Sequence, residues 1–370
     1  MIRVPPLPEA KKINCITPTS YETFKTCYLR GIIESNINFK KFIYFHPKTI
    51  LGIVSHEIIS DIYSNNLNEV LGNDFNSIVN TIKEIFKNKC QFYANQSKEN
   101  PFILKSNDVE NWPGYNMRLT RLIRFIQKNV NTNGKKQQTL KNKGGIEKTY
   151  EVFNGKLKGK PDRIRKSNDH EIIIEDYKTG QILEAGSLKP HIRRQMLLYS
   201  FICQEAFKVS KIRSIVIPLF GQPYEEEVDL LEAKSIANDA ITILNDVNRQ
   251  IEEVNSGLKS LLDLATPSKN ACRYCSFKFV CGRFWGNHEL RLSKDSFNVE
   301  GKVLGYKQYG KFTNIYIDCN LSKIVILKNI NEIAGSLLGE TIKLIDLQLE
   351  DNDDLYFIAV PTYRTIGFKL

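Results

Sequence analysis

The sequence contains no long hydrophobic run and no apolar segment at its N-terminus. No stretch approaches the ~20 consecutive apolar residues that a membrane-spanning helix needs. The first twelve residues, MIRVPPLPEAKK, have none of the apolar core that a secretory signal requires. We therefore expect a cytoplasmic protein.

Cysteine is scarce and unevenly spread, which excludes a small fold held together by disulfides. The chain has 370 residues and eight cysteines, at positions 15, 27, 90, 203, 272, 275, 281 and 319. Three of these fall within one short segment, a pattern that indicates metal ligation in a reducing compartment. Cys90, Cys203 and Cys319 lie among apolar residues, and we expect them to be buried, unreactive thiols.

A phosphate-binding G-x-x-x-x-G-K-[ST] loop is also missing, so the chain has no motor of its own and any unwinding needs a separate helicase. Basic residues exceed acidic ones by 52 to 41, a net charge of +11. This excess suits a polyanionic partner, because each phosphate contact releases counterions. A chain that is lysine-rich only for solubility would show the same balance.

Hydrophobic periodicity divides the chain into a helical part and a mixed part. Helices are predicted at 20–34, 50–64, 75–87 and 117–129, and a polar loop at 131–143. Strands are predicted at 148–153, 156–166, 171–178 and 212–219, and helices at 188–208 and 233–254. The predicted fold class is α/β, with a mixed central sheet and a helical N-terminal region.

The predicted pattern of secondary structure changes after about residue 295. Strands are predicted at 298–306, 313–319, 323–327, 341–349 and 355–362, with a helix at 330–338. Three strands, a helix and two strands is the order of an OB-fold barrel, although other small barrels share it. We expect one domain at 1–294 and a second, OB-like domain at 295–370. Its aromatic residues could stack on the bases of a single strand, pack in the barrel core or meet a partner protein: Tyr306, Tyr309, Phe312 and Tyr316.

Residues 159–180, GKPDRIRKSNDHEIIIEDYKTG, carry the main chemical signal. In a hairpin turning near Asp169, positions that sum to 338 face each other, which sets Asp162 opposite Asp176. Asp176 and Lys178 share a strand face. Facing carboxylates destabilise a hairpin unless a cation lies between them, and Mg²⁺ or Mn²⁺ prefers such ligands. A charged, solvent-exposed hairpin is the alternative, but the apolar run Ile172–Ile174 favours a buried central strand.

These segments resemble motifs II and III of the PD-(D/E)XK nucleases, most closely the RecB/AddB branch that includes CRISPR adaptation nucleases and exonuclease V. The resemblance implies a restriction-endonuclease-like core. Asp162 matches the first acidic position, and Asp176, Tyr177 and Lys178 match the (D/E)XK triplet. The resemblance further implies metal binding by Asp162, Asp176 and the carbonyl oxygen of Tyr177, with Lys178 assisting attack by an activated water.

Three further residue sets rest on the same resemblance. GIVSHEII, residues 52–59, resembles a G-x-x-x-H helix and makes His56 the third metal-binding side chain. QMLLY, residues 195–199, resembles a Q-x-x-x-Y motif, so Gln195 and Tyr199 would reach the site from one helix face, with ordinary helix packing as the alternative. Glu147 resembles a supporting glutamate. Basic residues that could line a nucleic-acid path are Lys158, Lys160, Arg163, Arg165, Arg193 and Arg194.

The cysteine segment CRYCSFKFVC, residues 272–281, supplies three thiols, one short of a complete set for zinc or a [4Fe–4S] cluster. The same nuclease branch carries an iron–sulfur staple with one upstream cysteine. TPTSYETFKTCYLRGI, residues 17–32, resembles that upstream segment, so the implied ligands are Cys27, Cys272, Cys275 and Cys281. Tyr28 stands where the branch has proline, and Cys15 is the reserve ligand. Phe284 and Trp285 would shield the cluster.

The resemblance spans roughly residues 15–290 and implies a Mg²⁺- or Mn²⁺-dependent deoxyribonuclease. We expect an exonuclease acting on single-stranded or unwound DNA in repair, recombination or defence, with a helicase or a defence complex as a further partner. One alternative is a non-catalytic nucleic-acid-binding or assembly subunit of a helicase–nuclease complex. Another is a zinc-stabilised RNA-processing protein.

Overall fold

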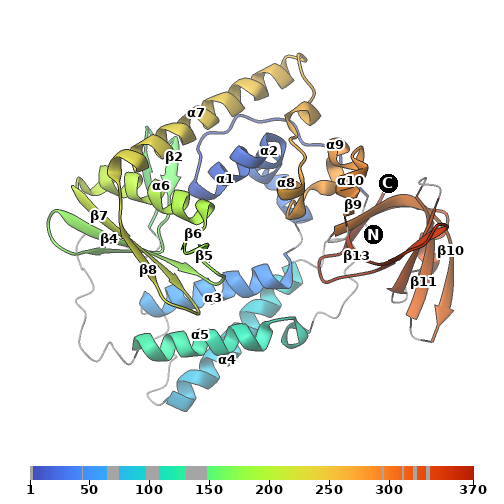
Figure 1. The fold of residues 1–370 in the computed structure, drawn as a ribbon, viewed down its shortest axis with the longest axis horizontal. Coiled ribbons are helices and arrows are strands. Elements are labelled where there is room, and N and C mark those ends of the chain that lie inside the picture. The colour runs from blue at the N-terminus through green and yellow to red at the C-terminus, as the bar shows by residue number, and fades with distance from the viewer. Residues whose placement is uncertain are drawn as a thin grey trace.

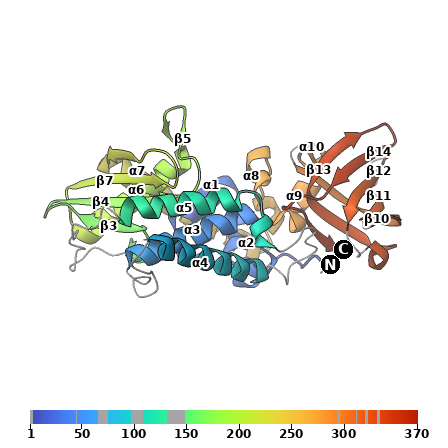
Figure 2. The same ribbon diagram turned by 90° about the horizontal axis from the view of Figure 1, so that it is seen from below.

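The computed structural model describes residues 3–43, 45–64, 75–96, 108–130, 148–293, 296–310, 312–319, 323–330 and 334–370. Figures 1 and 2 show a mixed sheet at one end of the molecule, a second sheet at the other, and helices between them. None of the helices in these ranges is long and apolar enough to cross a bilayer. The mixed α/β class predicted from the sequence is therefore found.

The first sheet is mixed and has the order β3-β4-β7-β8. Its strands are β3 (Arg163–Lys166), β4 (Glu171–Lys178), β7 (Lys211–Pro218) and β8 (Tyr224–Glu227). β4 and β7 run parallel, and the two outer pairings are antiparallel. All of β4 except Lys178 is buried, because helices cover both of its faces. The predicted hairpin register is also found, since Arg163 pairs with Glu175 and Ile164 with Ile174.

Helices on the two faces of this sheet belong to two hydrophobic clusters. On one face, α6 (Pro190–Phe207) connects β4 to β7 and packs against α7 (Leu230–Asn255) and α1 (Pro18–Thr26). On the other face lie α3 (Pro47–Tyr63), α4 (Phe75–Gln96) and α5 (Tyr115–Val130), whose core includes Tyr177 of β4. Alternate β4 side chains thus point into different helical layers.

Two predicted elements are divided in the structure. The helix predicted at 20–34 breaks at Cys27, whose backbone is extended, so α1 ends at Thr26 and α2 spans Tyr28–Ser35. The strand predicted at 156–166 becomes β2 (Leu157–Gly159), which pairs with β1 (Tyr150–Val152), and β3. Pro161 lies in the gap, and proline cannot donate a ladder hydrogen bond. Glu147 and the loop predicted at 131–143 lie outside the described residues.

The second sheet has the order β15-β13-β14-β12-β11-β10-β9, and β13 also pairs with β10. The pairings therefore close five strands, β10 to β14, into a ring in which β12 and β14 run parallel. This sheet has its own hydrophobic cluster. Its strands are β9 (Leu292–Ser293), β10 (Ser296–Tyr309), β11 (Phe312–Asp318), β12 (Ile324–Ile330), β13 (Thr341–Asn352), β14 (Tyr356–Val360) and β15 (Ile366–Lys369).

Short elements complete the described chain. The predicted helix at 330–338 contains only the 3-10 turn η7 (Ala334–Leu337) within the described residues. The cysteine segment contains α8 (Lys269–Arg273) and η6 (Lys278–Val280), followed by α9 (Gly282–Trp285) and α10 (His288–Arg291). The remaining elements are η1 (Ile37–Phe42), η3 (Val109–Asn111), η5 (Leu261–Leu264), β5 (Leu183–Glu184) and β6 (Ser187–Leu188).

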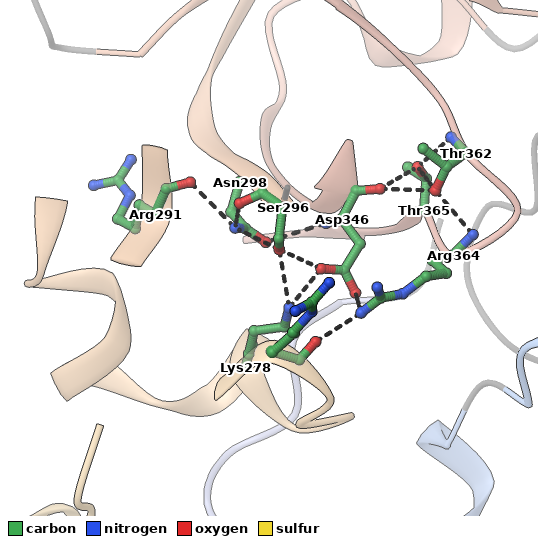
Figure 3. A network of polar contacts seen from close by, with 9 residues as sticks. Lys278, Arg291, Ser296, Asn298, Asp346, Thr362, Arg364 and Thr365 are labelled. Carbon is green, nitrogen blue, oxygen red and sulfur yellow. Dashed lines mark hydrogen bonds and ion pairs between the residues drawn. The ribbon is translucent and has the colours of Figure 1, made fainter. Parts of the chain in front are cut away.

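The second sheet docks on the cysteine segment through a polar network, drawn in Figure 3. Lys278 is only 2% exposed, and its Nζ lies 2.6 Å from Asp346 Oδ1. Arg364 Nη2 lies 3.3 Å from Asp346 Oδ2 and donates to the Arg273 carbonyl at 2.6 Å. A buried, paired lysine at this contact ties the position of the second sheet to that of the cysteine loop.

Candidate functional site

Asp162 is held at the end of the β3–β4 hairpin, one residue beyond the last ladder pair. Its Oδ2 accepts a hydrogen bond of 2.7 Å from the backbone N–H of Tyr177. Asp162 follows Pro161 and has no partner in the β3–β4 ladder. The hydrogen bond from Tyr177 replaces that pairing and fixes the carboxylate beside β4. The side chain remains 13% exposed, so it lies at the open end of the hairpin.

Asp176 lies on the same side of the hairpin and is 1% exposed. Burial raises the pKa of its carboxyl to about 6, with Lys178 opposing this shift and Asp162 adding to it. Lys178 Nζ forms an ion pair of 2.7 Å with Asp176 Oδ2, a buried oxygen that has no other polar partner among the described residues. A buried carboxylate oxygen without a hydrogen bond is costly and is typical of a site that binds a cation.

His56 reaches this place from α3, on the opposite side from α6. Its Nε2 lies 3.0 Å from the carbonyl oxygen of Tyr177 and 3.0 Å from Asp162 Oδ2. Burial disfavours the charged imidazole, but the hydrogen bond and charge of Asp162 outweigh it and raise the pKa of His56. The imidazole, a carboxylate and a backbone carbonyl thus meet within one hydrogen-bond length.

Gln195 and Tyr199 approach from one face of α6, because they are four residues apart. Gln195 Oε1 accepts from Lys178 Nζ at 2.9 Å, while its Nε2 lies 3.4 Å from Asp176 Oδ1 and 3.1 Å from Tyr199 Oη. Burial raises the pKa of Tyr199, so its hydroxyl stays protonated. The amide therefore fixes the position of the Lys178 ammonium.

Within the described ranges, no three histidine, cysteine, aspartate or glutamate side chains surround a common point as a metal site would. His56 contacts Asp162, and Lys178 contacts Asp176, instead. The donor set nevertheless fits Mg²⁺ or Mn²⁺, because it combines two carboxylates, a carbonyl and an imidazole with one oxygen that lacks a hydrogen bond.

The other face of β4 carries a charge network that sequence reasoning missed. Glu175 is 4% exposed and accepts from Arg163 at 3.2 Å, Arg165 at 2.6 Å and the Tyr177 hydroxyl at 3.1 Å. The register rule could have found it, since 163 and 175 also sum to 338. Arg163 and Arg165 were expected on the nucleic-acid path, and three more residues of that set pair with carboxylates elsewhere in the structure: Lys158, Arg193 and Arg194.

Arg118 of α5 is a second residue that the sequence did not single out. It is 6% exposed, and its guanidinium donates to the carbonyl oxygen of Thr179, the residue after Lys178. Burial, followed by the charge of Arg121, lowers the pKa of Arg118. No motif marks this arginine, because the contact depends on where α5 packs.

The four cysteines expected to act together line one cavity. Cys27, at the break between α1 and α2, faces Cys272, Cys275 and Cys281 across it. The other walls are largely apolar and include Leu29, Ile33 and Phe284. Burial raises the pKa of Cys275 to about 12, so a metal would have to displace its proton.

The remaining cysteines lie elsewhere. Cys15 is close enough to Lys158 to raise the pKa of that amine slightly, after the larger effects of Glu151. It does not line the cavity. Cys90, Cys203 and Cys319 are buried, as expected. The structure thus brings Cys27 to the three-cysteine segment and leaves Cys15 apart.

Comparison with known proteins identifies the family of the chain. A family model described as the PD-(D/E)XK nuclease superfamily matches residues 16–282. No curated protein sequence matches the chain. The similar solved structures include SSO0001, at 14% identity and a TM-score of 0.29, over 74% of this chain and 88% of its own. They also include a candidate exonuclease from Eubacterium rectale, at 10% identity and a TM-score of 0.36, over 67% of this chain and 83% of its own.

Proposed function

The chain belongs to the PD-(D/E)XK nuclease superfamily, and from this premise we propose that it is a divalent-metal-dependent nuclease that hydrolyses phosphodiester bonds in DNA. We infer exonuclease action on single-stranded or unwound DNA, in repair, recombination or defence. One observation carries the proposal. Asp162, Asp176 and Lys178 gather at the open end of a buried strand, where paired carboxylates would be costly without a role.

His56, Asp162, Asp176 and the carbonyl oxygen of Tyr177 would hold a Mg²⁺ or Mn²⁺ ion. When bound, such an ion polarises a phosphodiester oxygen and lowers the pKa of water. Two features of the chain hold the proposed metal ligands in position. The Tyr177 N–H holds Asp162 in place, and the burial of Asp176 keeps its carboxylate out of bulk water.

Lys178 is the group that meets developing negative charge on the phosphate. Its ammonium is held between Asp176 and Gln195, so little rearrangement is needed as that charge grows. Tyr199 fixes the other end of the Gln195 amide. Glu147, from outside the described residues, keeps its proposed supporting role.

We further propose that Cys27, Cys272, Cys275 and Cys281 hold a [4Fe–4S] cluster, which would place the chain in the RecB/AddB-like branch. Their common cavity supports this, although zinc accepts the same thiolates. Absorbance of the protein purified without oxygen separates the two, because only iron–thiolate centres absorb in the visible range. The ring of five strands supports an OB-like barrel at the C-terminus, because β12 and β14 pair in parallel across it.

A nuclease assay tests the activity. Labelled single- and double-stranded DNA and RNA would be incubated with Mg²⁺ or Mn²⁺ and with wild type, Asp162→Ala or Lys178→Ala. We expect cleavage of single-stranded DNA by the wild type and a loss of at least ~100-fold in either variant, the scale of losing one preorganised electrostatic group. Equal activity in all three would reject the catalytic proposal and favour a non-catalytic subunit.

A further inference from the structure

A cleft of about 590 Å³ lies where α3, the cysteine segment and the C-terminal sheet meet. Its volume falls within the range of ligand sites in proteins. The residues that line this cleft include His46, Lys48, Gly52, Thr179, Tyr274 and Arg364. Thr179 directly follows Lys178, so the cleft opens next to the proposed catalytic residues.

One face of α3 forms the floor that connects the cleft to the catalytic end of β4. Lys48, Gly52 and His56 are spaced four residues apart and therefore lie on the same face of the helix. Lys48 and His56 are separated by about 12 Å along the helix axis, at the usual rise per residue. A Cβ atom at Gly52 would lie 3.2 Å from Thr179 Oγ1, so a larger side chain there would narrow this floor.

The cleft is electropositive. Lys48 is exposed and makes no ion pair with any residue whose placement is described. Arg364 lines the opposite wall and shares the carboxylate of Asp346 with Lys278, as Figure 3 shows. Burial, and then the charges of Arg364 and Lys48, lower the pKa of His46 to about 4. Lys48 and Arg364 bring two positive charges to the cleft, and the one negative charge, on Asp346, is shared with Lys278. The resulting positive field attracts phosphate.

Tyr274 adds an aromatic surface at the mouth of the cleft. Its side chain is 66% exposed, although it lies between Cys272 and Cys275. The guanidinium carbons of Arg273 and Arg364 lie 5.4 Å and 5.3 Å from its ring centroid. An exposed ring beside guanidinium groups is the usual platform for stacking an unpaired base.

We propose that this cleft admits a single strand of nucleic acid, with its backbone along Lys48 and Arg364 and an unpaired base on Tyr274. The strand would continue along α3 to His56, a direction that rests on the proposed nuclease function. Only a single strand fits, because a base inside a duplex is paired and stacked and cannot offer its face to Tyr274 without being extruded.

The test measures binding separately from cleavage. Anisotropy of a fluorescent oligothymidylate would be followed with the full-length protein in Ca²⁺ in place of Mg²⁺. Lys48→Glu and Tyr274→Ala are compared with Lys83→Glu and Phe92→Ala, matched exposed residues on α4. We expect Kd to rise about 10-fold for each cleft variant, in keeping with the loss of one phosphate contact or one stacked base. The two α4 variants should bind like wild type.

Two refinements tie the result to the mechanism. Lys48→Ala should reduce the slope of log K against log salt by about 0.7, the value for one phosphate contact on a single strand. Tyr274→Phe should restore the binding that Tyr274→Ala loses, since the ring is kept. Wild-type affinity in Lys48→Glu and Tyr274→Ala would overturn the inference. So would an equal loss in Lys83→Glu, or a duplex of the same length that binds as tightly.

The cleft and the nuclease proposal can fail independently. If Lys178→Ala abolishes cleavage while the cleft variants bind like wild type, the activity stands and the cleft inference falls. If wild type cleaves no substrate, yet Lys48→Glu and Tyr274→Ala lose oligonucleotide binding, the cleft stands and the nuclease proposal falls.

Discussion

The proposed catalytic end of β4 and the cysteine cavity both gather side chains of types that can bind metals, but their surroundings differ. At β4, His56 and Lys178 are 31% and 24% exposed, and every neighbour that fixes the site is polar. The cysteine cavity is lined mainly by apolar residues such as Leu29 and Phe284, together with Arg30 and Lys278. Oxygen ligands beside partly exposed polar groups suit a reaction on a phosphate, whereas thiols in a mainly apolar cavity suit a centre that holds chain segments together.

The two regions also differ in the length of chain that they join. The β4 site takes its carboxylates and lysine from one hairpin, with His56 added from α3 and Gln195 and Tyr199 from α6. The cysteine cavity joins Cys27 to Cys281 and so would close nearly the whole length matched by the family model. Substitutions in the β4 site should therefore reduce activity, and substitutions in the cysteine cavity should reduce stability.

The largest expected effect comes from Cys275→Ser. If the cavity holds a metal cluster, its binding energy is folding energy, and losing one thiolate should cost more than ~5 kcal/mol, enough to unfold or loosen an ordinary domain. Urea unfolding and visible absorbance of protein prepared without oxygen measure this. Cys15→Ser, outside the cavity, is the matched control. Equal stability of the two variants would contradict a structural centre.

A smaller effect should follow from Asp346→Asn, which breaks the contact between the cysteine loop and the second sheet. Lys278 would keep its buried charge without its carboxylate, at a cost of about 3 kcal/mol. Asparagine tolerates the left-handed backbone of Asp346, where φ is 59°, so strain does not enter. Adding Lys278→Met should recover most of the loss in urea unfolding. A double variant as unstable as the single one would show that the charge is not the cause.

Local chemistry explains what the sequence could predict. The hairpin register follows from one turn, so Asp162, Asp176 and Lys178 could be placed by counting, and the isoleucine run marked β4 as buried. Pro161 could also have indicated the break between β2 and β3, although a single strand was predicted across it. These features depend on residues close together in the chain.

Tertiary packing decides the rest. The segment around Cys27, TFKTCYLR, contains no glycine or proline. Nothing in it therefore indicates the break between α1 and α2 that points Cys27 toward the cavity. Arg118 reaches Thr179 only because of where α5 packs. The contact of Lys278 with Asp346 joins parts of the chain that periodicity treats as separate domains.

Asp176→Asn should stabilise the metal-free protein while abolishing cleavage. Burial raises the folded pKa of Asp176 from 3.8 to about 6, so the folded state binds this proton more tightly than the unfolded state. Its contribution to stability is therefore greatest below pH 3.8 and is lost as pH rises through 6. In EDTA above pH 6, the variant should be more stable than wild type by about 3 kcal/mol, with the gap closing toward pH 4.

Magnesium should reverse this order. A cation that binds the native site stabilises it by mass action, so Mg²⁺ should raise the Tm of the wild type and leave that of Asp176→Asn unchanged. Thermal unfolding with EDTA and with Mg²⁺ measures both effects. An equal Mg²⁺ shift in the two proteins would place the ion elsewhere.

The smallest expected effect is that of Gln195→Ala, which tests whether a residue of the β4 site can affect activity without affecting stability. Gln195→Ala removes the acceptor that holds Lys178, but it leaves the charged groups and the metal ligands in place. The ammonium then keeps only its ion pair with Asp176 and is less well fixed, and we expect kcat to fall about 10-fold, or ~1.4 kcal/mol, with KM and Tm nearly unchanged. Gln204→Ala is the matched control, because it lies nine residues later and thus on the opposite face of α6. A fall in Tm as large as that in kcat would mean that Gln195 supports packing, and Lys178 would then need another positioning group.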